Sequence, residues 1–265
     1  MFPSPGKIYK GLFPFRLATT SYIYPSSYTT NVKLLAPHFD EIELLFFQSR
    51  PPESIPSPET INELVALASI HNLIYNIHLP LDISLADPNF TQRSNAIEVI
   101  KKIIGLTAPL NVSTYTLHLS RENDLNNAAE RSLWLEYIHT GIKELFASGI
   151  RGPQITVENL DYPLDLLEGV ITDLDLSVCL DMGHALKYGY DPATIYQQFK
   201  ERIKMIHLHG VENNKDHLPL NKIKTKGLRK ILKMLRGYEE TISIEVFSLR
   251  DLEMSLNTLE TLWPL

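Results

Sequence analysis

Short segments with strand propensity alternate with helical patterns eight times along the chain. Strands that alternate with helices form a parallel sheet, and eight such units close into a barrel. The pattern predicts an α/β fold, a (β/α)8 TIM barrel that residues 1–265 form as one domain. The expected strands are 15–22, 41–47, 72–79, 112–119, 154–159, 176–181, 204–209 and 241–247. The expected helices are 30–39, 59–71, 92–104, 128–147, 163–171, 191–202, 225–236 and 249–262, and irregular loops are expected at 80–91, 120–127 and 210–224.

The composition limits the partners of the chain. With 25 basic and 31 acidic residues the formal net charge is -6, which disfavours broad attraction to a nucleic-acid backbone. The single cysteine, Cys179, lies in an apolar strand and leaves no intramolecular disulfide to form. No apolar leader and no run of about 18 apolar residues is present. We therefore expect a soluble, cytoplasmic protein without a nucleic-acid or membrane partner.

Histidines and carboxylates stand at the carboxyl ends of six expected strands, where the active sites of such barrels lie. A single strand-end histidine is commonly capped by a backbone carbonyl, and a single glutamate can pair with a lysine. Such structural roles do not predict that the histidines and carboxylates of six strands gather at one face of the barrel. A mixture of imidazole and carboxylate ligands suits zinc, manganese or iron and predicts a metal site. The residues are His78, His118, Glu158, Asp181, His207 and Glu245, with His184, His209, Asp216 and His217 in or beside the following loops.

A family resemblance supports the metal site. The segment CLDMGHALKYGYD at 179–191 resembles the sixth-strand signature of endonuclease IV-type apurinic endonucleases. That group belongs to the xylose isomerase-like barrels. The segments IHLH at 206–209 and VEN at 157–159 fit the same set, and the resemblance covers nearly the whole chain.

The resemblance implies a ligand set for the metals. The first site would consist of His78, His118 and Glu158, and the second of Glu158, Asp181, His207 and Glu245. Glu158 would bridge the two ions, and Glu158 and Glu245 are the predicted catalytic carboxylates. A third site would begin with His184 and include His217. There the chain departs from the family, because Asp216 and His217 are adjacent instead of separated by one residue.

Two classes of reaction remain open on this scaffold. Related sugar isomerases and epimerases hold a single manganese with residues matching Glu158, Asp181, His207 and Glu245. Those four residues therefore do not distinguish the two classes of reaction. The pair His78 and His118 favours a second metal. Two metals imply phosphodiester hydrolysis, in which they neutralise charge on the attacking and leaving oxygens. We predict a metal-dependent phosphodiesterase with two or three divalent ions, zinc, manganese or iron; the alternatives are a single-metal sugar isomerase or epimerase and an apurinic endonuclease.

The loops and the opening of the chain suggest a substrate. The loops at 48–58 and 80–91 carry only Arg50 as a basic residue, whereas a DNA endonuclease needs basic and wedge residues there. FRLATTSYIYP at 15–25, the run at 31–47, HLPLD, IHLHGV and KDHLPL resemble the cobamide-remodelling phosphodiesterases. The resemblance implies a small-molecule phosphodiester, a corrinoid, as the partner. Candidate substrate-binding residues are Tyr22, Gln48, Arg121 and His209; the aromatic residues Tyr22, Tyr24, Phe46 and Phe47 form either a binding surface or core.

Overall fold

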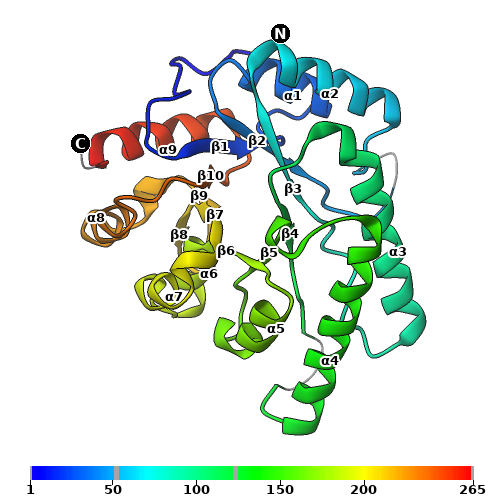
Figure 1. Cartoon of the computed structure of the whole chain (residues 1–265). Coiled ribbons are helices and arrows are strands. Elements are labelled where there is room, and N and C mark those ends of the chain that lie inside the picture. The colour runs from blue at the N-terminus through cyan, green and yellow to red at the C-terminus, as the bar shows by residue number, and fades with distance from the viewer. Residues whose placement is uncertain (1, 51–53, 122–124, 264–265) are drawn as a thin grey trace.

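Eight parallel strands form a closed barrel in the computed structural model, which describes residues 2–50, 54–121 and 125–263 (Figure 1). The order of the strands around the barrel is β1-β10-β7-β6-β5-β4-β3-β2, so neighbours in sequence are neighbours in space. This arrangement confirms the predicted TIM barrel. The strands are β1 (Arg16–Thr20), β2 (Glu41–Leu45), β3 (Ile74–His78), β4 (Tyr115–Leu117), β5 (Ile155–Glu158), β6 (Ser177–Asp181), β7 (Ile203–Leu208) and β10 (Thr241–Ile244).

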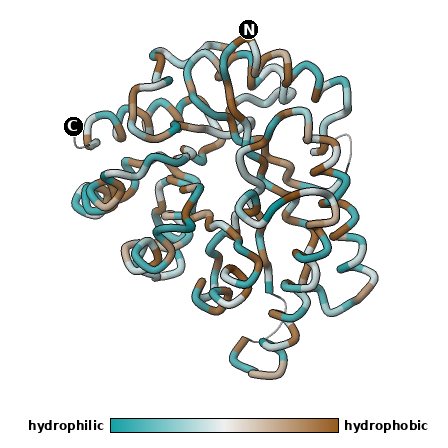
Figure 2. The backbone as a smooth tube through the Cα atoms, viewed as in Figure 1, coloured by the Kyte–Doolittle hydropathy of each residue, from teal (hydrophilic) through white to brown (hydrophobic). Residues whose placement is uncertain are grey.

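Helices surround the barrel and cover its apolar outer face (Figures 1 and 2). Several begin at a residue whose side chain accepts a backbone N–H of the first turn, as Ser57 and Asn127 do. Among the described residues, no helix has both the length and the apolar character needed to cross a bilayer. The helices are α1 (Tyr28–Leu35), α2 (Pro58–His71), α3 (Phe90–Thr107), α4 (Ala128–Leu145), α5 (Glu168–Asp173), α6 (Met182–Tyr188), α7 (Pro192–Phe199), α8 (Thr225–Met234) and α9 (Leu249–Leu262).

The segment that follows β7 differs from the prediction. The expected irregular loop at 210–224 contains an antiparallel hairpin of β8 (Gly210–Glu212) and β9 (Lys215–Leu218). Asn213 and Asn214 form its turn with φ of 53° and 62°, the left-handed backbone that two-residue hairpin turns require. The hairpin packs against α6 and brings β9 to the carboxyl end of the barrel.

A second difference concerns the segment after β6. Two helices follow the strand, α6 and then α7, where the sequence predicted one helix at 191–202. Gly189 ends α6 with φ of 80°, and Asp191 caps α7 immediately before Pro192. The short helix α6 therefore starts directly at the end of a barrel strand.

The interior of the barrel is polar along its axis. Residues two apart on a strand share a face, so the inward positions of β2 are Glu41, Glu43 and Leu45. At the amino-terminal end, the Glu41 carboxylate accepts hydrogen bonds from Arg16 and Thr241, and also from Asn76 and Ser113. Buried charges need such partners. The carboxyl end of the barrel carries the candidate site.

Candidate metal centre

Glu158, the last residue of β5, lies at the centre of the site. Its Oε2 is 3.0 Å from Nε2 of His118 and 3.3 Å from Nε2 of His78, and its Oε1 is 2.9 Å from Nδ1 of His184. The side chain of Glu158 is 1% exposed. The ligand atoms of His78, His118 and Glu158 lie within 4.8 Å of one another, which is the spacing of a common ion. The structure thus brings together the three residues of the predicted first site.

A second group of ligands adjoins the first. Nδ1 of His207 is 3.2 Å from Oε2 of Glu245, 3.5 Å from Oε2 of Glu158 and 3.8 Å from Oδ2 of Asp181. The pairing of β6 with β7 places Asp181 directly opposite His207, and β10 follows on the other side of β7. Glu158 is common to both groups, as a bridging carboxylate requires.

Several donor atoms of the site lack hydrogen bonds, which fits a pair of cations. A buried polar atom without a partner is costly, so folded proteins leave few of them. Here several such atoms point into one small space. Neutral imidazole nitrogen and carboxylate oxygen together form the donor set of zinc, manganese or iron. The atoms are Nε2 of His118, Oε2 of Glu158, Nδ1 of His184, Nδ1 of His207 and Oε2 of Glu245.

The electrostatics keep the carboxylates of the site ionised. Burial alone would raise the pKa of Glu158, but the neighbouring imidazoles of His118 and His207 hold that pKa well below its usual range. Burial is likewise outweighed at Glu245, where His207 and His217 keep the pKa of the carboxyl low. Both carboxylates therefore carry the negative charge that a cation requires.

The direction of Asp181 is set by the residues around it. Its carboxylate caps α6 by accepting the backbone N–H of His184 at 2.6 Å, while Asn159 bonds the backbone N–H and carbonyl of Asp181 at 2.8 Å and 3.0 Å. His209 donates from Nε2 to the Asp181 carboxylate at 3.1 Å. Nδ1 of His209 accepts the backbone N–H of His217 at 2.9 Å. Predicted as a substrate contact, His209 is instead fully buried and holds a candidate ligand in place.

The glycine in the segment DMGH makes room for His209. A Cβ added to Gly183 would lie 1.9 Å from Cε1 of that ring. We predict that Gly183→Ala displaces the ring, weakens metal binding and destabilises the fold by about 1–3 kcal/mol, the usual cost of overpacking. Chemical denaturation and metal titration measure the two effects. Gly169→Ala, at a helical position with open space around it, is the matched control, and equal behaviour of both variants would contradict the argument.

A buried carboxylate beneath the site was not predicted from the sequence. Oε1 of Glu43 is 2.9 Å from Nε2 of His207, the nitrogen that faces away from the other ligands, and Ser243 donates to Oε2 of Glu43 at 2.6 Å. A carboxylate on the second nitrogen of a metal-binding histidine fixes the orientation of the ring. The sequence contained a signal for Glu43, because Glu41 and Glu43 alternate with apolar residues and so point to the barrel axis.

The remaining predicted ligands lie at the edge of the two groups. His217, on β9, has Nε2 3.5 Å from Oε2 of Glu245 and its ring 5.9 Å from that of His184. Asp216 pairs with Lys187 at 2.6 Å, and its Oδ2 is 3.9 Å from Nε2 of His184. The residues of the predicted third set, His184, Asp216 and His217, therefore lie close together, although Asp216 forms an ion pair with Lys187.

Two imidazoles of the metal-free centre are protonated at neutral pH. Burial opposes their charge, but Asp181 and Glu158 raise the pKa of His184 to about 10, and Glu245 raises that of His217 to about 9. A divalent cation bound to Glu158 and Glu245 would cancel the negative charge that raises these two pKa values, so metal binding must release protons. We expect proton release on zinc binding at pH 7.5, and affinity that rises with pH toward 9–10. Calorimetry in buffers of different ionisation enthalpy measures this, and an uptake of protons would disprove it.

The same raised pKa values affect the stability of the metal-free protein. A group whose pKa is higher in the folded state stabilises that state most when it is charged in both states, below its ordinary value of 6.5. This stabilisation is lost as the pH rises through about 9 and 10. Metal-free protein should therefore become easier to unfold over that range.

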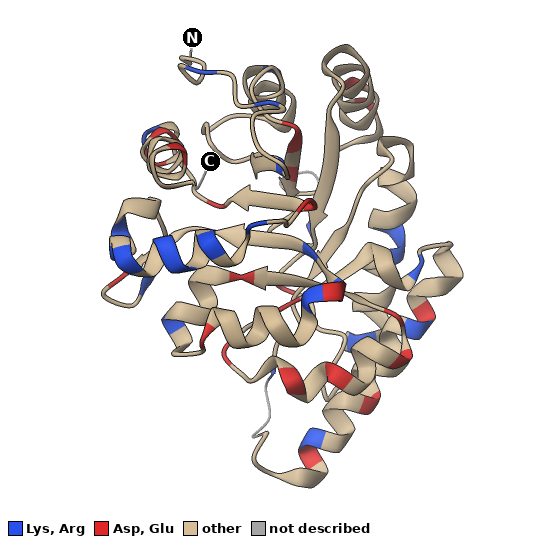
Figure 3. Cartoon of the chain, turned by 60° about the vertical axis from the view of Figure 1, so that its left-hand side comes forward, with Lys and Arg blue, Asp and Glu red and all other residues tan. Residues whose placement is uncertain are grey.

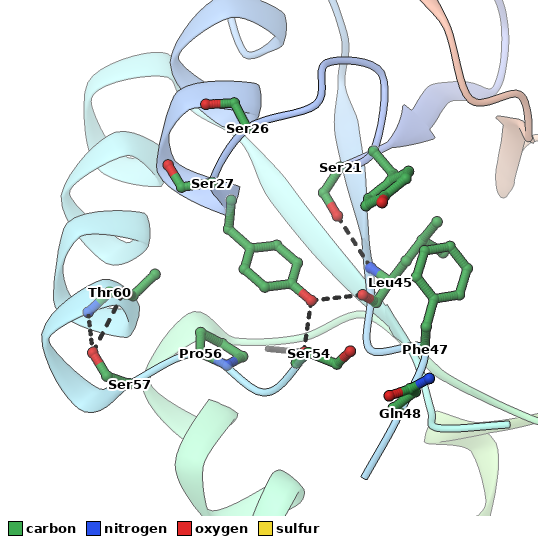
Figure 4. Close-up of a pocket in the computed structure, with 12 residues that line it drawn as sticks. Ser21, Ser26, Ser27, Leu45, Phe47, Gln48, Ser54, Pro56, Ser57 and Thr60 are labelled. Carbon is green, nitrogen blue, oxygen red and sulfur yellow. Dashed lines mark hydrogen bonds between the residues drawn. The ribbon is translucent and has the colours of Figure 1, made fainter. Parts of the chain in front are cut away.

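A cavity of about 500 Å³ lies between the loops that follow β1 and β2 (Figure 4). Its lining includes Tyr22 and Gln48, two of the predicted substrate contacts. The hydroxyl of Tyr28, another lining residue, donates hydrogen bonds to the backbone carbonyls of Leu45 and Ser54. Arg121, a third predicted contact, is exposed and pairs with Asp161 at 3.0 Å. The lining residues are Ser21, Tyr22, Ser26, Ser27, Tyr28, Leu45, Phe47, Gln48, Ser54, Pro56, Ser57 and Thr60.

Aromatic rings connect this cavity with the metal centre. Phe247 stacks on His217 with 5.0 Å between ring centroids, and it lies 6.3 Å from Tyr22 and 6.0 Å from Phe47. Tyr22 is 50% exposed and Phe247 is 37% exposed, so the rings offer an open apolar surface. Tyr24 and Phe46, which the sequence left undecided, belong to the core. Phe247 was not singled out, because it follows β10, far from the opening segment of the chain.

Comparison with known proteins assigns the family. The model of the xylose isomerase-like TIM barrel family matches residues 34–262, so the chain belongs to that family. A D-tagatose 3-epimerase-like protein is 22% identical with a TM-score of 0.75, covering 93% of this chain and 96% of that one. Endonuclease IV from Thermus thermophilus is 18% identical with a TM-score of 0.69, covering 93% and 99%. The IOLI protein with a binding zinc atom is 12% identical with a TM-score of 0.73, covering 94% and 98%.

Proposed function

We propose that the chain is a two-metal phosphodiesterase that hydrolyses a small-molecule phosphodiester. The observation that carries the proposal is the position of His78 and His118, whose Nε2 atoms lie 3.3 Å and 3.0 Å from the same oxygen of Glu158. One cation needs only the group around Asp181, His207 and Glu245. His78 and His118 have a chemical role if Glu158 bridges two ions, because they then bind the second one.

The residues divide the chemical work between them. Divalent cations bound in the two groups would supply positive charge to the phosphate oxygens and lower the pKa of an attacking water. Glu158 and Glu245 hold that charge in place with ionised carboxylates. Asn159 and His209 hold Asp181 by hydrogen bonds, so this ligand is oriented before substrate arrives. The buried carboxylate of Glu43 lies 2.9 Å from Nε2 of His207. Such preorganisation stabilises charge that develops in the transition state.

The surroundings of the centre support a cobamide as the substrate, cleaved at the phosphodiester of its nucleotide loop. Tyr22, Phe47 and Phe247 offer apolar surface to a ring system beside the metal centre. The adjoining cavity of about 500 Å³ is lined by serine hydroxyls, which suit the hydroxyls of a nucleoside. Binding would therefore draw on aromatic contact and hydrogen bonds around a single phosphodiester.

DNA is a weaker candidate for this site. A duplex-binding enzyme neutralises several phosphates with lysine and arginine. The net charge of the whole chain is -6. Apart from α8, which carries Lys226, Arg229, Lys230 and Lys233, Figure 3 shows acidic and basic residues interspersed over the described part of the chain. In the loop at 48–58, where Arg50 is the single basic residue, residues 51–53 lie outside the described part of the chain. The endonuclease alternative therefore rests on the motif at 179–191 and on fold similarity.

A single-metal sugar epimerase is the second candidate function. Asp181, His207 and Glu245 form one ligand group, Glu158 adjoins it at 3.5 Å from Nδ1 of His207, and a D-tagatose 3-epimerase-like protein shares the fold. This alternative leaves His78 and His118 without a chemical role.

One set of assays separates these functions. Metal-loaded protein is incubated with a complete cobamide, an abasic DNA duplex and a ketohexose, and products are resolved by chromatography. We expect release of the lower-ligand nucleoside from the cobamide, with a shallow dependence on salt, and no change in the other two. Steeply salt-dependent incision of abasic DNA, or epimerisation of the ketohexose, without reaction of the cobamide, would overturn the proposal.

A further inference from the structure

The third set of predicted metal ligands already holds a cation, the ammonium of Lys187. Its Nζ lies 2.6 Å from Oδ2 of Asp216, the oxygen that also faces Nε2 of His184 at 3.9 Å. The other oxygen of Asp216 is 3.3 Å from Nδ1 of His217. A third metal would need the carboxylate that the lysine occupies.

The sequence explains why the lysine stands there. His184 and Lys187 are three residues apart on α6, so both project from the same side of the helix. The hairpin of β8 and β9 packs on α6 and brings Asp216 to that side. The side chains of Lys187 and Asp216 are only 18% and 23% exposed, so solvent screens the pair weakly. A metal ion bound to Asp216 would meet the repulsion of a nearby ammonium.

His209 cannot replace the acid in a third site. Its ring lies near those of His184 and His217, at 5.8 Å and 4.3 Å between centroids. Both of its nitrogens are engaged, however, because Nδ1 accepts the backbone N–H of His217 and Nε2 donates to Asp181. The residues present therefore do not fit a third metal.

We propose that Lys187 takes the place of a third metal ion: the chain binds two divalent cations, and the lysine provides fixed positive charge for a phosphate oxygen beside them. A lysine ammonium is a common ligand of phosphate and forms strong charge-assisted hydrogen bonds with it. The part concerning phosphate rests on the proposed function, whereas the metal count does not.

Metal counting tests the first half of the inference. The purified variants are equilibrated with excess zinc, freed of unbound metal and measured by mass spectrometry. Wild type and Lys187→Arg should hold two ions per chain. Lys187→Met, which keeps the length of the side chain and loses its charge, should gain a third ion, and addition of Asp216→Asn should remove that ion again. Three ions in wild type, or two in Lys187→Met, would overturn the exclusion of a third metal.

Binding of inorganic phosphate to the two-metal protein tests the second half. Asp216→Asn and the double variant Lys187→Met/Asp216→Asn both lack the third acid, so they differ only in the ammonium. We expect the double variant to bind phosphate about tenfold more weakly, the effect of one charge-assisted hydrogen bond. Lys230→Met, at a largely exposed lysine of α8, is the control and should leave the affinity unchanged. Equal affinity of the first two variants would refute the role of Lys187, whatever the outcome of the cobamide assay.

Discussion

Replacement of Glu158 by glutamine should abolish phosphodiester hydrolysis, with a loss on the order of a thousandfold or more in kcat/KM. A carboxylate offers two anionic oxygens and can join two cations, whereas an amide offers one neutral oxygen and an N–H₂ group that repels a cation. The side chain of Glu158 contacts His78 and His118 of the first group and lies 3.5 Å from Nδ1 of His207 in the second, so one change disturbs both groups. Steady-state kinetics and metal analysis of the same preparation measure the result.

The fold should survive this substitution. The apolar core lies between the outer face of the strands and the helices, while Glu158 points to the barrel axis. Circular dichroism of Glu158→Gln should therefore match that of wild type. Glu144→Gln makes the same chemical change at an exposed position of α4 and should retain full activity. If Glu158→Gln keeps its turnover, the bridging role is wrong.

The barrel and the main ligands could be read from the sequence because both depend on local patterns. Alternation of strands and helices determines the barrel, and in a closed parallel barrel every strand ends at the same face. His78, Glu158 and Asp181 are the last residues of their strands, so their meeting follows from the fold alone. No distance between strands had to be known.

Contacts that depend on register or on a connecting loop were beyond the sequence. Lys187 reads as an ordinary charged residue of a helix until the hairpin brings Asp216 against it. Glu43 reaches His207 across the barrel interior although β2 and β7 are not neighbours in the sheet. The Asn213-Asn214 pair that forms the hairpin turn was a usable signal, since asparagine tolerates the left-handed conformation.

Loss of either histidine of the first group should separate the two metal sites. We expect His78→Ala and His118→Ala each to reduce the metal content from two ions to one per chain and to lower hydrolysis by at least about a hundredfold. The remaining ion stays because Asp181, His207 and Glu245 are untouched and their ligand atoms lie within 4.8 Å of one another. Metal analysis and kinetics on the cobamide substrate give both numbers.

This pair of variants also decides between the two reaction classes on the scaffold. A single-metal epimerase needs only the group around His207, so it would keep its metal and its rate when His78 or His118 becomes alanine. A two-metal phosphodiesterase loses the ion that His78 and His118 bind and with it the charge opposite one phosphate oxygen. His139→Ala, on α4 and outside the ligand groups, controls for the removal of an imidazole. Full metal content in both variants, together with an undiminished rate of ketohexose epimerisation, would move the assignment to the sugar epimerases. The histidines at 3.3 Å and 3.0 Å from Glu158 would then bind no ion.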